Sequence, residues 1–169
     1  NLLTGMLVNS GNDAATALAE FDSGNEKAFT DKMNQKAFDL GLKNTHFSNA
    51  KGFDEKGNYS TAFDIMIFAR KALEYPFIKK TAAIKTAEVT SVNGKIKHQL
   101  ESTNELLENQ YFKVIGLKTG RTPAAGESFV SLAQAQNGHS ILTVILDSPD
   151  RFKETKIVLD WILRNYQFQ

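Results

Sequence analysis

The apolar positions in the first quarter of the chain recur at three- and four-residue intervals, a spacing that predicts helices. Two short helices are expected within residues 1–22, where the apolar spacing stops at Asn9–Asn12 and then resumes in an alanine-rich run. Asp13 is placed to cap the second of these helices. The break between them is therefore expected to be a helix-to-helix loop.

Two further helices follow from the same spacing. One should begin after Asn25, a residue type that caps helices, and end at Gly41, where a left-handed conformation is wanted. The other should begin at Thr61, which forms a capping-box pattern with Asp64, and end before Pro76. The intervening stretch is rich in Asn, Gly, Lys and Ser and predicts an ordered surface loop.

The second half of the chain changes to a two-residue alternation, which predicts strands. Asn93-Gly94 and Asn137-Gly138 are dipeptides that favour tight hairpin turns by supplying residues with positive φ. A short helix is expected at 103–108. Five strands are expected, at residues 84–92, 95–100, 111–117, 129–136 and 139–146.

A closing helix is expected after Ser148, as the cap, and Pro149, at the first helical position. Its apolar face would include Trp161, which, like Phe63 and Phe68, is expected in the core. The predicted fold class is α+β, with one five-stranded antiparallel sheet and helices packed on its faces. A single domain would span residues 1–169, with a mainly helical part at 1–83 and a sheet part at 84–169.

Composition narrows the function classes. A length of 169 residues and a 41% hydrophobic content suit one folded domain with a substantial core. Twenty basic against 19 acidic residues leave a net charge of +1, which argues for neither nucleic acid nor an anionic membrane as partner. With no cysteine, disulfides and thiolate zinc sites are excluded. The three histidines, His46, His98 and His139, are too scattered to indicate a metal site.

The beginning of the chain lies inside a periodic apolar pattern, at Leu2, Leu3, Met6 and Leu7, with no initiator Met before it. We therefore expect that a further N-terminal part precedes this sequence in a longer protein. Loss of such a part would leave an apolar surface, which predicts self-association or pairing with a neighbouring chain.

Two short stretches combine polar groups with glycine at the ends of predicted elements. The first is Ser10-Gly11-Asn12, in the helix-to-helix loop, and the second is Lys118-Thr119-Gly120-Arg121-Thr122, at the end of a predicted strand. Each alone is ordinary turn or strand-end chemistry. Together and in this order they resemble the Ser-x-Asn and Lys-Thr-Gly elements of serine penicillin-recognising enzymes.

The resemblance extends over essentially the whole chain. The segments LLTGMLVNSGNDAATALAE (2–20), GLKNTHFSNAKGF (41–53) and IGLKTGRTPAAG (115–126) are similar to the D-alanyl-D-alanine carboxypeptidases, the low-molecular-mass penicillin-binding proteins. The resemblance implies a β-lactamase/transpeptidase-like fold. It also implies a serine peptidase that removes the terminal D-Ala of peptidoglycan pentapeptide through an acyl-enzyme, without metal or organic cofactor.

The resemblance also implies roles for individual residues. Lys118 and Thr119 would bind the terminal carboxylate of the substrate, and Lys118 would polarise Ser10, which relays a proton to the leaving nitrogen. Asn12 would offer its amide to the substrate backbone. The backbone N–H of Arg121 would complete an oxyanion hole. Gly120 would leave room for substrate to lie along the strand as an added β-strand, and Thr122 would support the strand edge.

One element of the family pattern does not appear where the family has it. The nucleophile is the serine of a Ser-x-x-Lys helix upstream of Ser-x-Asn, and only nine residues precede Ser10. The one Ser-x-x-Lys match, Ser48 to Lys51, lies after Ser-x-Asn in a glycine-flanked loop, so we reject it. No nucleophile is therefore assigned in this chain, and the chain alone is expected to be nearly inert.

The expected partners are D-Ala-D-Ala peptides of peptidoglycan and β-lactams, in an exported protein of the cell envelope. Two alternatives stay open. One is a class A-like β-lactamase, disfavoured because that group has aspartate where this chain has Gly11. The other is a non-catalytic module that binds D-Ala-D-Ala ends through Lys118 and Thr119.

Overall fold

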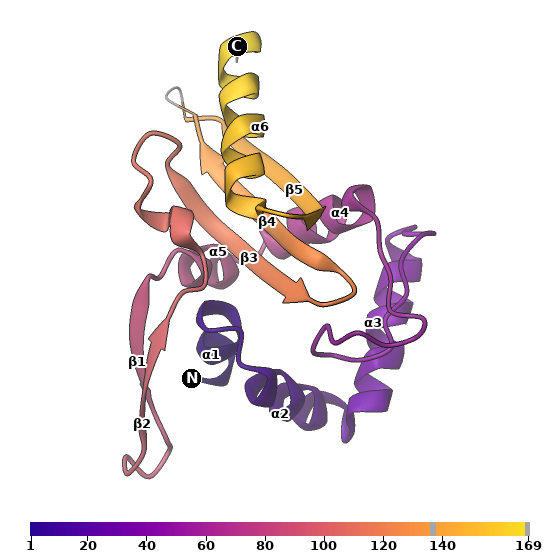
Figure 1. Ribbon diagram of the computed structural model, residues 1–169. Helices are drawn as coiled ribbons and strands as arrows, with labels where there is room; N and C mark the ends of the chain where they lie inside the picture. Colours follow the sequence, from indigo (N-terminus) through magenta and orange to yellow (C-terminus); the bar gives the residue numbers. More distant parts are fainter. Residues whose placement is uncertain (136–137, 168–169) are drawn as a thin grey trace.

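The computed structural model describes residues 1–135 and 138–167, which form two β-sheets with helices around them (Figure 1). Three helices occupy the N-terminal part: α1 (Leu2–Val8), α2 (Asn12–Ser23) and α3 (Glu26–Asp39). The predicted break between α1 and α2 is present. Gly11, and not Asp13, is the N-cap of α2; the Asp13 carboxylate accepts a hydrogen bond from the adjacent N–H of Ala14 (2.8 Å).

The helix α3 has the predicted cap. The Asn25 side chain accepts a hydrogen bond from the N–H of Ala28 (2.8 Å), and Gly41, just beyond the helix, has a φ of +73°. Asn25→Ala should lower the free energy of unfolding by about 1 kcal/mol, because one N–H of the first turn loses its acceptor. Urea unfolding measures this change. Asn25→Asp, which keeps an acceptor, should restore most of the loss, and equal losses in both variants would contradict the capping role.

Two helices follow the loop. The first is α4 (Ala62–Ala72), capped as predicted by Thr61, whose hydroxyl accepts from the N–H of Asp64 (3.2 Å). The Asp64 carboxylate does not return this bond: it accepts from the N–H of Asn44 (3.0 Å) and from the Thr45 hydroxyl (2.8 Å), so it fastens the loop to α4. Pro76 opens a helix that the sequence analysis missed, α5 (Pro76–Ala82), with the proline in the first turn, where it costs no hydrogen bond.

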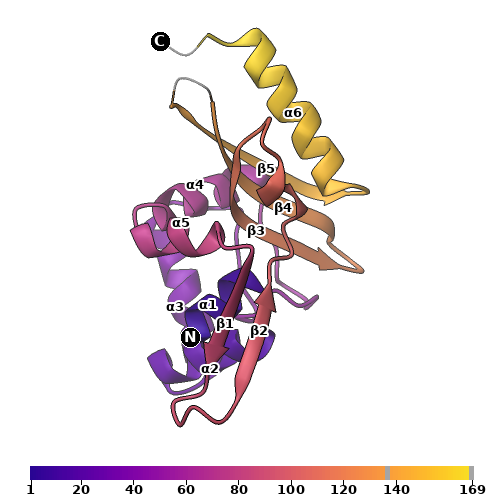
Figure 2. The same cartoon turned by 90° about the vertical axis from the view of Figure 1, so that its left-hand side faces the viewer.

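The strands form two sheets. The hairpin of β1 (Thr86–Thr90) and β2 (Lys97–Glu101) stands apart from a three-stranded antiparallel sheet of β3 (Val114–Thr122), β4 (Gly126–Gln134) and β5 (Ser140–Ser148), as Figure 2 shows. The prediction of antiparallel strands in an α+β fold is confirmed. The prediction of one five-stranded sheet is wrong for the residues described: alternation marks strands but does not specify which of them pair. Along the chain, the 3₁₀ helix η1 (Glu105–Glu108) lies between β2 and β3.

The two predicted hairpin turns have different outcomes. In the first, Gly94 has a φ of +70° while Asn93 does not have positive φ, so only one of the two expected left-handed residues is present. The second turn includes Asn137, which lies outside the described residues; the flanking strands β4 and β5 pair as expected.

The three-stranded sheet carries helices on both faces. On one face, α6 (Arg151–Asn165) buries Phe152 and Leu159 against Phe129 and its neighbours. On the other, α4 and α5 cover Leu117 and Leu132. The approach of α5 is close: a Cβ at Gly116 would lie 2.9 Å from that of Ala82, which only glycine avoids. This arrangement fixes β3, whose far end carries the Lys-Thr-Gly element.

The closing helix differs in detail from its prediction. It is capped by Asp150, which accepts from the N–H of Lys153 (2.9 Å), while the Ser148 hydroxyl accepts from the N–H of Asp150 (3.0 Å). Trp161 is 54% exposed and Phe63 is 65% exposed, so their assignment to the core is wrong. No helix in the described ranges is long and apolar enough to cross a membrane.

Candidate active site

The break between α1 and α2 meets the end of β3. The Lys118 Nζ donates hydrogen bonds to the Ser10 Oγ and to the Thr119 carbonyl (2.8 Å), which joins two residues 108 positions apart. Ser10 itself has a φ of +54°, an uncommon conformation for a residue with a side chain. The fold therefore holds the hydroxyl of Ser10 against the amine of Lys118.

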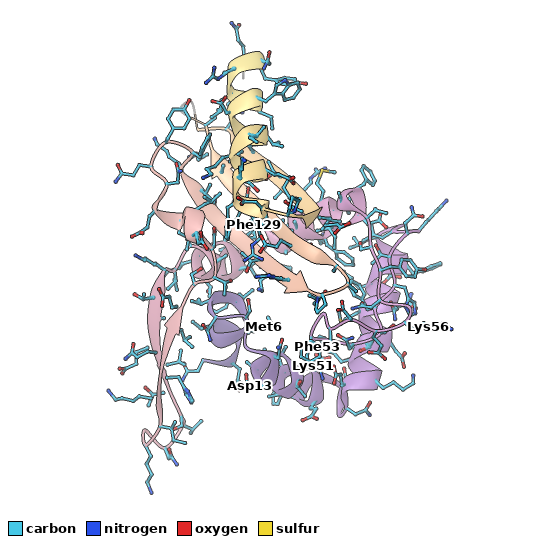
Figure 3. All side chains as sticks on the ribbon, in the orientation of Figure 1. Met6, Asp13, Lys51, Phe53, Lys56 and Phe129 are labelled. Carbon is cyan, nitrogen blue, oxygen red and sulfur yellow. The ribbon has the colours of Figure 1, made fainter. Side chains whose placement is uncertain are left out.

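This contact lies in a hollow of about 610 Å³. Asn12 also lines it, from the first turn of α2, as does the whole stretch Lys118–Thr122. The remaining wall comes from α1, from Thr103, from Arg151 and from the loop stretch Ala50–Phe53. Figure 3 shows Lys51 and Phe53 of this loop between α2 and the end of the β3–β4 hairpin. All seven residues that the sequence analysis singled out thus line one hollow.

The surroundings of Lys118 strongly shift its pKa. Burial, reinforced by the nearby positive charge of Arg151, lowers the pKa of Lys118 to about 8. Near neutral pH the amine is still mostly protonated, but it can give up its proton far more readily than an exposed lysine. A lysine of this pKa beside a serine hydroxyl is suited to move a proton.

The neighbours of Lys118 along β3 are tied to other elements. The buried hydroxyl of Thr119 shares a hydrogen bond with that of Thr103. The Gly120 carbonyl accepts from the Arg151 guanidinium (2.8 Å). A Cβ at Gly120 would meet only the Cβ of Ser128, at 3.9 Å, so packing within the chain leaves room for a side chain there.

The last two residues of β3 turn toward solvent and toward the loop. Arg121 is paired loosely with Glu127 (3.7 Å) and its side chain is 75% exposed. The Thr122 hydroxyl donates to Asp54 (2.5 Å) and accepts from the N–H of Ala125 (3.1 Å). Thr122 is therefore bonded both to the loop and to the turn that follows β3.

Comparison with known proteins shows the family of this chain. Residues 1–150 match the family model described as D-alanyl-D-alanine carboxypeptidase. The chain belongs to the D-alanyl-D-alanine carboxypeptidase family. The D-alanyl-D-alanine carboxypeptidase DacF of Bacillus subtilis is 38% identical over 168 residues, which cover 98% of this chain and 43% of the relative.

Solved structures of this family have the same fold. Penicillin binding protein 5 from Haemophilus influenzae superposes with a TM-score of 0.88 at 35% identity, covering 98% of this chain and 48% of that one. Penicillin-binding protein D2 from Listeria monocytogenes, in its cefotaxime-bound form, superposes with a TM-score of 0.80 at 34% identity. The match covers 94% of this chain and 64% of the chain of that protein. The chain therefore spans under half the length of the first two relatives and about two thirds of the third.

The residues of the hollow that the sequence analysis did not assign to a site include Thr103, Arg151 and Phe53. Thr103 was expected only as the start of a short helix, and Arg151 only as part of the closing helix. Neither forms a motif with its sequence neighbours, so no local signal could have found them. The segment containing Phe53 was quoted for its similarity to the carboxypeptidase family, without a role at the hollow.

The structure also bears on the Ser-x-x-Lys match that was rejected. The Ser48 hydroxyl donates to the carbonyl of Lys56 (3.1 Å), whereas the Lys51 amine is paired with Glu26 (2.8 Å). The two side chains are engaged with different partners. These contacts give no support to Ser48 and Lys51 as a nucleophile and its lysine.

The described part of the chain was also compared with the ligand sets that hold metal ions. No group of three or more His, Asp or Glu side chains is placed to hold an ion there. His46 instead makes a hydrogen bond between its Nδ1 and the Gly57 carbonyl (2.7 Å) in the loop.

Proposed function

We propose that this chain supplies the carboxylate-binding and proton-transfer part of a serine-type D-alanyl-D-alanine carboxypeptidase. The whole protein would remove the terminal D-Ala of peptidoglycan pentapeptide in the cell envelope, through an acyl-enzyme on a serine of a Ser-x-x-Lys element. The observation that carries this proposal is the contact between Lys118 and Ser10 within one hollow.

The free carboxylate of the peptide would be bound by positive charge and hydroxyl groups. Lys118 and Arg151 are two cations lining the same hollow, and the hydroxyl of Thr119 lies beside them. The Arg151 Nε is buried and has no partner among the described residues, so the guanidinium has unused donor capacity. Hydrogen bonds from cations to a carboxylate are among the strongest that proteins make.

The proton for the leaving group would pass along the same contact. When the peptide bond breaks, the amine of D-Ala takes the proton of the Ser10 hydroxyl, and the Ser10 oxygen recovers one from the Lys118 ammonium. The lowered pKa of Lys118, about 8, brings the amine close to the pH at which such a transfer is balanced.

The remaining residues would position the peptide. The Asn12 amide can hydrogen-bond the substrate backbone, and the N–H of Arg121 would face the developing oxyanion. Gly120 leaves the edge of β3 open, which suits a peptide that adds as a further strand. The β-lactams that bind relatives would use the same hollow, since they also carry a carboxylate.

Peptide binding should depend on the charge of Lys118. Calorimetry of the chain with N-acetyl-D-Ala-D-Ala should show an affinity that falls as pH rises through about 8, because deprotonation removes one cation that attracts the carboxylate. Lys118→Met should weaken binding by about tenfold or more and remove this pH dependence. Binding of undiminished strength in Lys118→Met would overturn the proposal.

A further inference from the structure

Thr103 lines the hollow but has no part in the chemistry proposed above. It comes from the segment between β2 and η1, and it is exposed. Its hydroxyl shares a hydrogen bond with the hydroxyl of Thr119, a buried residue of β3 that lies 16 positions further along the chain. Two hydroxyl groups from separate segments therefore meet at the wall of the hollow.

The position of Thr103 is fixed on both sides by its neighbours. The Ser102 N–H donates to the Lys85 carbonyl (2.8 Å), just before β1. The Asn104 N–H donates to the Ser102 hydroxyl (3.2 Å), and the Asn104 Oδ1 accepts from the N–H of Leu106 (3.0 Å). Leu106 is only 4% exposed and belongs to the core that α6 covers. The backbone therefore holds the Thr103 side chain at the edge of the hollow.

The charges around the two hydroxyls favour an anion. Four cationic side chains line the hollow: Lys51, Lys118, Arg121 and Arg151. Lys51 and Arg121 are paired with carboxylates outside the lining, so most of the attraction comes from the other two. Among the described residues that line the hollow there is no aspartate or glutamate. A negatively charged group there would meet attraction from several sides and no repulsion from a lining carboxylate.

The pair of hydroxyls has a donor to spare. A hydroxyl donates one hydrogen bond and can accept two, whereas a carboxylate only accepts. Neither the Thr103 nor the Thr119 hydroxyl has a further hydrogen bond in the part of the chain that the structure describes, so the pair uses one of its two O–H groups. If each hydroxyl turned its O–H to one carboxylate oxygen, one neutral bond would be exchanged for two charge-assisted bonds, which are the stronger kind.

We propose that Thr103 is a substrate-binding residue of the hollow, which donates its hydroxyl to one oxygen of the terminal carboxylate of the peptide while Thr119 donates to the other. This inference rests on the proposed function for the identity of the ligand. The two hydroxyl oxygens are in contact, so they are close enough together for each to reach one oxygen of the same carboxylate.

Peptide affinity tests the contribution of the Thr103 hydroxyl. In calorimetry with N-acetyl-D-Ala-D-Ala, Thr103→Val should weaken binding about tenfold, because the carboxylate loses a charge-assisted hydrogen bond. Thr103→Ser keeps the hydroxyl and should retain most of the affinity. Thr86→Val, which changes an exposed threonine of β1 outside the hollow, is the matched control and should leave the affinity unchanged. An unchanged affinity in Thr103→Val, or an equal loss in Thr103→Ser, would overturn the proposal.

A second background separates direct contact from orientation of Thr119. If Thr103 only orients the Thr119 hydroxyl, Thr103→Val should have no further effect once that hydroxyl is absent. If Thr103 donates to the carboxylate itself, Thr103→Val should still weaken binding about fivefold or more when it is added to Thr119→Val. We expect this further loss. Equal affinities in Thr119→Val and in the double variant would contradict direct contact.

Titration with acetate tests the site without a peptide. In NMR spectra of the chain, acetate should shift the methyl resonances of Thr103 and Thr119 with one affinity, whereas acetamide, which is neutral, should shift neither. Thr103→Val should weaken the acetate affinity seen at Thr119 about tenfold. No shift at Thr103, or an acetate affinity at Thr119 that is the same in Thr103→Val, would overturn this inference. If N-acetyl-D-Ala-D-Ala does not bind the unmodified chain, the proposed function fails, and the acetate titration still decides whether the two hydroxyls bind a carboxylate.

Discussion

The chain alone should hydrolyse acetyl-Leu-D-Ala-D-Ala about 10⁶-fold more slowly than the same chain joined to a Ser-x-x-Lys segment, because loss of a serine nucleophile costs a serine peptidase about that much. Ser10 does not replace that nucleophile in our proposal, since its role is to pass a proton. Ser48 does not replace it either, since its hydroxyl is bonded to the Lys56 carbonyl. Release of D-Ala is the quantity to measure.

The joined protein would carry the segment that precedes the matched region in DacF of Bacillus subtilis, placed before Asn1. It should release D-Ala, and alanine in place of the segment's own serine should return the rate to that of the chain alone. Lys118→Ala in the joined protein should also lower the rate, which ties the activity to this hollow. Rapid hydrolysis by the chain alone would show that a different nucleophile operates.

Phe129→Ala should lower the free energy of unfolding by about 3–5 kcal/mol, the range found when a buried phenylalanine leaves a cavity. Phe129 is 0% exposed, and its ring packs edge-on against Phe152, with centroids 5.4 Å apart. It lies in β4 directly opposite Thr119 of β3. The substitution should therefore loosen the contact of α6 with the sheet.

Urea unfolding, followed by circular dichroism, measures this loss. Phe21→Ala is the matched control: Phe21 is 90% exposed on α2, and its removal should change stability by no more than about 0.5 kcal/mol. A loss below about 1 kcal/mol in Phe129→Ala would mean that α6 and the sheet do not share the core described above.

The sequence by itself determined the elements that local chemistry specifies. The cap at Asn25, the left-handed Gly41 and the cap at Thr61 follow from interactions within a few residues, and the structure has all three. The α+β class followed from the change of apolar period between the two halves. The family followed from extended segments that resemble the carboxypeptidases and occur in the same order along the chain. Ser10 belongs to one of these segments and Lys118 to another.

Local chemistry was misleading where two nearby residues could perform the same task. Asp150 caps the last helix in place of Ser148, and Pro76 begins a helix although a proline also ends the preceding run. Either Ser148 or Asp150 can accept hydrogen bonds from the free N–H groups at the start of the last helix. Likewise, a proline is compatible both with the end of one helix and with the first turn of the next. The residue pattern alone does not choose between these possibilities.

The tertiary structure decided which distant groups meet. The Asn93-Gly94 turn predicted that β1 and β2 pair as a hairpin, but the sequence did not show that this hairpin stands apart from the other three strands and contacts α1. Arg151 and Thr103 reach the hollow from two separate parts of the chain. A sequence pattern reports periodicity over a few turns or strands, whereas these contacts depend on the packing of helices on both faces of β3, β4 and β5. That packing brings the Lys118 amine to Ser10 and excludes enough water to lower the pKa of Lys118.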